Sequence, residues 1–512
     1  MCEPLCDSTW DLFACALLGI QYTKTVGVLL RFRTCTRPIC KLLGSDLNMA
    51  KTRFRPTAFH VKVGDDTLND LAQRLASVRL PPNEIDPGAV DPRNGAWSRG
   101  ASLAAVRHLS EYWKDQFLPK WREVHERRLN GLPHFHGDVD GLRMHFIHAQ
   151  SASASAIPLL LVHGWPGSVV EFLELIPLLT GGERSFHVVA PSLPGYAWSE
   201  APSEPGADAE WMAEKMHSLM LNLGYTHYAA QGGDWGSVIT KHCALNHPQH
   251  CVALHLNMFV PQAPRGHIYG SLKALALLLF KNFIFSAEQN EGIHDSLDFF
   301  KHETAYQATQ GTKPQSLGYG LNDSPVGLLA WILEKFQTWS DVGFMGNADH
   351  NSWSTDVKDK FLTNLTLYWV TQTITSSVRI YYDELGHSPL YTGTRTPLPL
   401  PDKHLGTGQK YCAVPTGFIA ANDLFRFPKA FAQLTHNVQH WTSPGAGGHF
   451  FALEQPVAMA KDLVLFFHEV LDFGECIRTA PEPGALPPWT ADAAAFYAAL
   501  AAGVVAGVRA CL

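Results

Sequence analysis

The sequence predicts an α/β fold in which helices flank a mostly parallel sheet. Between residues 157 and 256, apolar strand-like runs alternate with segments of helical periodicity. Such alternation is typical of a parallel sheet covered by helices on both faces. A mainly helical block follows, and the strand pattern resumes near residue 411. With 46% apolar and 17% charged residues, the composition is that of a chain that buries a large core.

Each element of this fold has its own pattern in the sequence. Strands are expected at residues 157–162, 186–190, 228–231, 252–256, 411–414 and 438–442. The helices expected between and after them are at residues 169–179, 211–223, 237–245 and 456–471. Before them, helical spacing predicts helices at 68–78, 103–113 and 121–129, and alternation predicts a strand at 142–148. The first 150 residues are therefore expected to contain an α-rich leader.

Six segments follow from these patterns. We expect an atypical N-terminal extension at 1–52, with Met49 a candidate start, and a leader at 53–150. The α/β core is expected at 151–261 and 406–474, with a Pro/Ala-rich tail at 475–512. The helical block at 262–405 lies between strands of the core. A helical insertion at such a place is expected to be a lid over the active site.

Charge and cysteine content exclude several classes of protein. Forty basic and 47 acidic residues give a net charge of −7, which argues against a nucleic-acid binder. Ten cysteines without any C-x-x-C pair favour a reducing compartment over a disulfide scaffold or a zinc site. The longest apolar runs are shorter than the roughly 20 residues of a membrane span, so we expect none.

A short glycine-rich motif follows the strand expected at 228–231. Residues 232–236 read Gly-Gly-Asp-Trp-Gly, which fits the sharp strand-to-helix turn that presents a nucleophile, with Asp234 in place of the usual serine. The alternative is an ordinary aspartate cap of the next helix. An aspartate nucleophile needs no base for its attack on carbon. A base is required later, to activate water against the resulting ester.

Candidates for the rest of a catalytic triad follow the last two strands. Asp423 comes after the strand at 411–414, and His449 follows two glycines after the strand at 438–442. The order nucleophile, acid, histidine is that of α/β-hydrolases. We expect Asp423 to orient the His449 imidazole and to stabilise its charged form. The alternative for Asp423 is a residue of a loop turn.

Residues 163–167, His-Gly-Trp-Pro-Gly, follow the first core strand, where this fold completes its oxyanion hole. The backbone N–H groups of Trp165 and Trp235 are the candidate donors, because proline lacks an N–H. Displacement at carbon also requires a proton donor when the leaving group is an alkoxide, and phenols serve as such acids. The expected lid contains four candidates, although packing is the commoner role of a lid tyrosine: Tyr306, Tyr319, Tyr381 and Tyr382.

From residue 54 to residue 471, about four-fifths of its length, the chain resembles the microsomal-type epoxide hydrolases. These are α/β-hydrolases with an N-terminal leader and a helical lid. The resemblance is carried by residues 75–81, 121–133, 140–142, 163–167, 232–237, 321–327, 415–418 and 447–450.

The resemblance implies roles for single residues. Asp234 matches the nucleophile, His449 the base, and Tyr306 and Tyr381 the lid tyrosines. Asp423 matches the relay acid, where the family often has glutamate and a loop longer by one residue. The implied reaction converts an apolar epoxide to a vicinal diol with water and without a cofactor or metal, as in the detoxification and catabolism of aromatic hydrocarbons.

Two other functions fit the same motifs. A haloalkane dehalogenase uses an aspartate ester as well, but its halide leaves without a proton, so the lid tyrosines favour the epoxide. A non-catalytic lipid- or hormone-binding member of the fold would not need the full set of catalytic groups. We expect a cytoplasmic protein, with peripheral attachment to the endoplasmic reticulum membrane as the alternative. A homodimer is compatible with the sequence.

Overall fold

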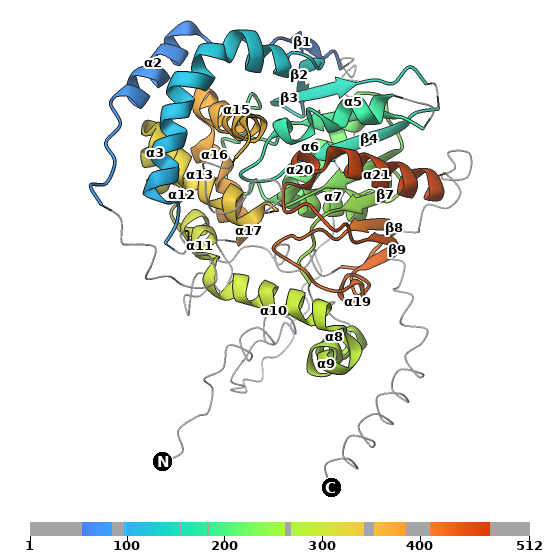
Figure 1. Ribbon diagram of the computed structural model, residues 1–512. Coiled ribbons are helices and arrows are strands. Elements are labelled where there is room, and N and C mark those ends of the chain that lie inside the picture. Colours follow the sequence, from blue (N-terminus) through green and yellow to red (C-terminus); the bar gives the residue numbers. More distant parts are fainter. Residues whose placement is uncertain are drawn as a thin grey trace, which may run out of the picture.

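The computed structural model describes residues 54–83, 97, 99–153, 155–181, 184–261, 268–341, 353–385 and 410–471. The expected N-terminal extension and the Pro/Ala-rich tail lie outside the described residues, as do residues 262–267, 342–352 and 386–409. Figure 1 gives the arrangement of the described elements. Among the described residues, no helix combines the length and the apolar character that crossing a membrane requires.

In the part of the chain that the structure describes, nine strands form one sheet in the order β1-β2-β3-β5-β4-β6-β7-β8-β9. The strands from β5 to β9 in this order are parallel, and β1, β2 and β3 extend one edge as antiparallel strands. The strands are β1 Thr57–Phe59, β2 His134–Val139, β3 Leu142–Ala149, β4 Ile157–Val162, β5 Phe186–Pro191, β6 Tyr228–Gly232, β7 Cys251–Leu256, β8 Cys412–Ile419 and β9 His436–Thr442.

All seven strands expected from the sequence are present. Every residue of β4 and of β7 is buried, so both faces of the parallel part are covered, as the continuous apolar runs predict. The sequence analysis missed β1 and β2. The turn from β2 to β3 has positive φ at Asp140 and Gly141, which is the Asp-Gly signature of a tight hairpin.

The core helices lie in the connections between the parallel strands and after the last strand. They are α5 Leu175–Thr180, α6 Ala209–Asn222, α7 Trp235–Asn246, α19 Lys429–Ala432, α20 Phe451–Glu454 and α21 Pro456–Val470. The continuous helix expected at 169–179 is wrong. A 3₁₀ turn, Val169–Phe172, precedes the short α5, and Pro177 lacks the N–H that an unbroken helix would donate to Leu173.

The leader packs against the lid (Figure 1). The leader helices are α2 Asp65–Ala76 and α3 Leu103–Tyr112, and helical turns continue through π and 3₁₀ segments to α4 Arg127–Leu129. The lid helices are α8 Ile268–Leu279, α9 Lys281–Ile284, α10 Ala287–His302, α11 Ala305–Thr312, α12 Pro314–Asp323, α13 Pro325–Trp339, α15 Thr355–Thr371, α16 Ile374–Ser377 and α17 Arg379–Leu385. The Trp113 indole donates to Thr366 Oγ1 of α15 at 3.0 Å.

The register of the parallel strands brings four loops to one edge of the sheet. Val162 of β4 pairs with Gly232 of β6, and Phe418 of β8 pairs with Trp441 of β9. Leu256 of β7 links the two pairs, since it lies opposite both Gly232 and Phe418. The segments that follow β4, β6, β8 and β9 carry the candidate catalytic residues, so the topology gathers those residues at the carboxyl edge, where open α/β sheets bind ligands.

Candidate active site

Asp234 stands on a strained turn between β6 and α7. Its φ of 49° and ψ of −129° are rarely adopted by a residue other than glycine, and such strain persists only where the surroundings impose it. The turn is also closely packed. A Cβ on Gly236 would lie 2.0 Å from Val162 O, and a Cβ on Gly164 would lie 2.2 Å from Asp234 Oδ1. Both positions therefore require glycine.

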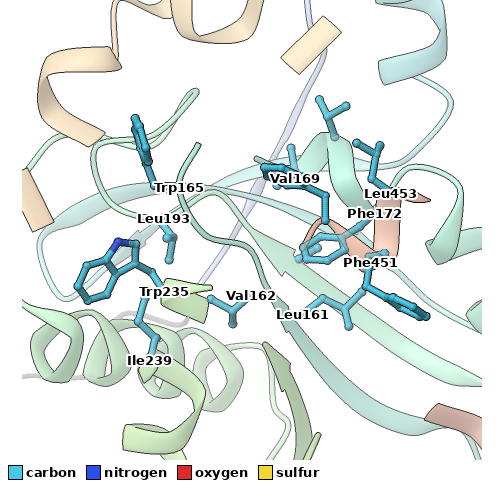
Figure 2. Packing of buried hydrophobic residues seen from close by; sticks show 14 of the residues in the cluster. Leu161, Val162, Trp165, Val169, Phe172, Leu193, Trp235, Ile239, Phe451 and Leu453 are labelled. Atoms are coloured by element: carbon cyan, nitrogen blue, oxygen red, sulfur yellow. The ribbon is translucent and has the colours of Figure 1, made fainter. Parts of the chain in front are cut away.

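The loop after β4 binds one oxygen of this carboxylate. The Trp165 N–H donates to Asp234 Oδ1 at 2.7 Å. Figure 2 shows Trp165 and Trp235 in the buried cluster near Leu193 and Ile239. The role of the Trp235 N–H in an oxyanion hole stays a prediction.

Side chains that the sequence analysis did not single out hold this loop in place. From lid helix α15, Asn364 Nδ2 donates to Pro166 O at 2.8 Å, and the Tyr368 hydroxyl donates to Gly167 O at 2.7 Å. Within the loop, His163 Nε2 accepts from the Leu193 N–H at 3.2 Å. Burial lowers the pKa of His163 to about 4, so this imidazole is neutral and acts as an acceptor.

His449 lies between two carboxylates. Its Nδ1 contacts Asp423 Oδ1 at 2.7 Å, and its Nε2 lies 3.4 Å from Asp234 Oδ2. All three side chains are largely buried, with 1%, 3% and 17% exposed for His449, Asp423 and Asp234. Burial alone would lower the pKa of His449, but the charges and hydrogen bonds of Asp423 and Asp234 raise it well above its usual value. The imidazole is therefore protonated while both carboxylates are charged.

Glu454 of α20 fixes the segment that carries His449. Its carboxylate accepts hydrogen bonds from the N–H groups of Gly448 at 2.8 Å and Phe450 at 2.9 Å, on either side of His449. A third bond, at 2.8 Å, comes from the Asp341 N–H. Burial raises the pKa of Glu454 to about 7. The sequence analysis missed this residue, although its place four residues after Phe450 is the usual spacing of neighbours on one helical turn.

Tyr306 and Tyr381 converge from two lid helices. Their side chains are 6% and 2% exposed, whereas Tyr319 and Tyr382 are 71% and 41% exposed. The rings of Tyr306 and Tyr381 lie 5.8 Å apart, and both contact the Trp165 ring at 5.7 Å. Burial, then the nearby Tyr306 and Asp234, raise the pKa of Tyr381 well above its usual value, so its hydroxyl keeps its proton at neutral pH.

A small cavity lies beside Asp234 and His449. Asp234, His449, Trp165 and Glu171 are among the residues that line it, and its size is that of about one water molecule. The structure thus brings together Asp234, His449, Asp423, Tyr306, Tyr381 and Trp165. The arrangement supplies a carboxylate beside an N–H donor, a histidine with its own carboxylate, and two buried phenols.

Comparison with known proteins identifies the family to which this chain belongs. Residues 56–172 match the family model described as the epoxide hydrolase N terminus, and residues 157–345 match that of the alpha/beta hydrolase fold. The chain is 35% identical to Epoxide hydrolase 1 of Sus scrofa over 80% of this chain and 87% of the relative. The chain belongs to the epoxide hydrolase family. This epoxide hydrolase is also similar to two solved structures.

One is the juvenile hormone epoxide hydrolase from the silkworm Bombyx mori, with a TM-score of 0.69 and 30% identity over 81% of this chain and 95% of that one. The other is the Aspergillus niger epoxide hydrolase, with a TM-score of 0.66 and 28% identity over 82% and 97% of the two chains. The α/β-hydrolase fold and the enzyme class expected from the sequence are thereby confirmed. The dehalogenase and the non-catalytic alternatives find no support in these relatives.

Proposed function

We propose that this epoxide hydrolase converts an apolar epoxide to a vicinal diol in two steps, through a covalent ester on Asp234. The observation that carries the proposal is the setting of the Asp234 carboxylate. One of its oxygens accepts from the Trp165 N–H at 2.7 Å, and the other lies 3.4 Å from His449 Nε2. A carboxylate held by an N–H donor and a charged imidazole keeps a fixed orientation toward an incoming carbon.

In the first step, one oxygen of Asp234 attacks an epoxide carbon and the carbon–oxygen bond of the ring breaks. The leaving oxygen takes a proton from Tyr306 or Tyr381. Both phenols are buried, and the pKa of Tyr381 is raised by burial and by the neighbouring Tyr306 and Asp234. A phenol that remains protonated at neutral pH is a competent acid for an alkoxide, which is far more basic.

The second step uses the change in charge that the first step causes. Esterification removes the negative charge of Asp234, and that charge is one of the groups that raise the pKa of His449. The pKa of His449 therefore falls, its proton returns to the phenolate of the lid tyrosine, and the neutral imidazole becomes a base that takes a proton from water. The water oxygen attacks the ester carbonyl carbon of Asp234 while Asp423 stabilises the imidazolium. The bond between Cγ of Asp234 and the ester oxygen breaks, and that oxygen leaves with the diol after it takes the proton from His449. The second proton of the water then passes from the Asp234 carboxyl to His449, which restores the free enzyme.

The donors beside the ester stabilise its tetrahedral intermediate. In this proposal the N–H groups of Trp165 and Trp235 form the oxyanion hole. The 2.7 Å bond from Trp165 to Asp234 Oδ1 supports the first donor, and the second rests on the sequence motif. Loss of one such donor typically costs a factor of about 10² to 10³ in rate.

Replacement of His449 tests the order of the steps. His449→Gln should form the ester and fail to hydrolyse it, so that the intact mass of the protein rises by the mass of the substrate. His294→Gln, on the lid surface with a side chain 76% exposed, is the matched control and should turn over like the wild type. Multiple turnovers of His449→Gln at the wild-type rate would contradict the assignment.

Three further parts of the proposal are open to direct measurement. The aromatic surroundings of Tyr306 and Trp165 favour apolar epoxides. Rates measured with styrene oxide, arene oxides and fatty-acid epoxides would rank these substrates.

Cysteine usage favours a cytoplasmic location, with peripheral attachment to the endoplasmic reticulum membrane as the alternative, and cell fractionation distinguishes the two. Light scattering would establish whether the enzyme is a homodimer.

A further inference from the structure

Glu171 is a buried acid of the active site to which the mechanism above gives no role. It lies in the 3₁₀ turn Val169–Phe172. This turn follows the loop after β4, residues 163–167, which is called the oxyanion loop. The small cavity beside Asp234 and His449, here called the inner cavity, has Glu171 in its wall. A second cavity, the outer cavity, has Glu171 in its wall as well. Each has room for about one water molecule.

The outer cavity lies where the leader, the lid and the core meet. Its wall includes Arg128 of the leader, Lys360 and Thr363 of lid helix α15, and Glu174 of the core. Charged side chains surround it, because Lys360 Nζ pairs with Glu174 at 2.9 Å and Arg128 also pairs with Glu174. The Arg128 and Glu174 side chains are 32% and 38% exposed. The outer cavity therefore lies close to solvent.

Tight packing holds the Glu171 carboxyl between the two cavities. A Cβ on Gly167 would lie 1.7 Å from Glu171 Oε1, so the carboxyl occupies space that only a glycine leaves free. Glu171 is partly accessible to water, and it lines both cavities.

The charge state of Glu171 follows from its neighbours. Burial raises the pKa of Glu171 to about 8, with His449 lowering it and Asp234 and Glu454 raising it. At neutral pH the carboxyl is mainly protonated. A neutral acid in this position has both an O–H donor and a carbonyl acceptor, and it adds no second negative charge beside the nucleophile.

We propose that Glu171 holds the hydrolytic water in the inner cavity beside His449, and that the outer cavity supplies that water. The proposal rests on the two-step mechanism. One O–H group of the water donates a hydrogen bond to the Glu171 carbonyl oxygen, and His449 Nε2 takes the other proton of the water. The water oxygen is then free to form its bond to the ester carbonyl carbon of Asp234. The bond between Cγ of Asp234 and the ester oxygen breaks, the released alkoxide receives the proton from His449, and the remaining proton of the water passes from the Asp234 carboxyl to His449.

Water reaches the ester by a route separate from the substrate in this arrangement. The lid tyrosines mark the side from which the epoxide approaches Asp234. The outer cavity touches the 3₁₀ turn and α15 instead. An apolar substrate that fills the space between the tyrosines and the nucleophile therefore does not block the supply of water.

The test separates the two steps by rapid mixing with styrene oxide and intact-mass detection of the ester. Glu171→Leu should slow ester hydrolysis about 10²-fold and change ester formation by less than about threefold. Glu171→Gln keeps a neutral carbonyl acceptor and should retain most of the rate. Glu214→Gln, remote on α6 with a side chain 47% exposed, is the matched control.

Wild-type hydrolysis in Glu171→Leu would overturn the proposal. Equal slowing of both steps in Glu171→Leu and Glu171→Gln, with a lower melting temperature, would also overturn it, because Glu171 would then be structural. Absence of any ester in the wild type and in His449→Gln would instead refute the two-step mechanism. That outcome is distinguishable from failure of the Glu171 role.

The outer cavity has its own pair of variants. Thr363→Leu fills the cavity with extra carbon atoms and should slow hydrolysis of the ester but not its formation. Thr363→Val keeps the shape of threonine and should behave like the wild type. Equal hydrolysis rates in a folded Thr363→Leu and in Thr363→Val would remove the outer cavity from the proposal. If Thr363→Leu does not fold, slow hydrolysis in Thr363→Met supports this route and wild-type hydrolysis refutes it.

Discussion

Asp423→Asn removes the charge beside His449 while keeping the size of the side chain. Asp423 Oδ1 accepts from His449 Nδ1 at 2.7 Å and from the Leu424 N–H at 2.6 Å. The asparagine carbonyl can accept both hydrogen bonds at the same places. The variant therefore isolates the effect of the negative charge on the imidazolium that forms during ester hydrolysis.

The magnitude follows from Coulomb's law. The 2.7 Å contact between Nδ1 and Oδ1 corresponds to charge centres about 4 Å apart, which at an effective dielectric constant of about 20 gives about 4 kcal/mol. Loss of this stabilisation in the transition state should slow ester hydrolysis about 10²- to 10³-fold. Ester formation needs no base and should change less than about tenfold.

Rapid mixing followed by acid quench measures both steps. Asp423→Asn should give a burst of one substrate bound per enzyme, followed by slow release of diol. Hydrolysis at the wild-type rate would show that the charge of Asp423 does not act on His449. Slow ester formation with fast hydrolysis would refute the order of events proposed for this site.

Three further predictions concern the lid, the His449 segment and the stability of the core. Tyr306→Phe and Tyr381→Phe should each slow ester formation about 10²-fold with little change in ester hydrolysis, measured in the same experiment. Glu454→Gln replaces one of the two carboxyl oxygens that accept from three N–H groups with an amide NH₂ and should lower both the melting temperature and kcat, at a cost of about 1–3 kcal/mol. Although burial alone would raise the pKa of Asp462, hydrogen bonds from His255 and from a second histidine lower it to about 2. Asp462→Asn should therefore destabilise the protein above about pH 4, and the difference from the wild type in urea unfolding should shrink as the pH falls toward about 2.

Strong local patterns made the core and the nucleophile predictable. The apolar run of β4 is buried at every residue, so its pattern left little choice of structure. The motif around Asp234 could be recognised in the sequence because the turn restricts its residues. The backbone is strained at φ 49°, and Gly236 lies too close to Val162 O for a side chain. Asp423 and His449 could be proposed because each follows a strand whose carboxyl end faces the same edge.

Contacts distant in sequence explain what the sequence analysis missed. Asn364 and Tyr368 act on the oxyanion loop across about 200 positions, and nothing in the local pattern of α15 marks them. Glu171 follows Ser168 by three residues, a spacing typical of a helix cap, so the pattern indicated a helix start instead of an active-site acid. The strand β2 was missed because its polar histidines hide the alternation, although the Asp-Gly turn before β3 was visible.

The most direct test of the account is one turnover of an epoxide in water enriched in ¹⁸O. The purified enzyme, in excess over styrene oxide, completes one turnover and is digested. The mass of the peptide that contains Asp234 is then measured by mass spectrometry. The account predicts ¹⁸O in the Asp234 carboxylate and almost none in the diol, because water attacks the ester carbonyl carbon. Label in the diol alone would mean that water attacks the epoxide directly, and the role of Asp234 as nucleophile would be refuted.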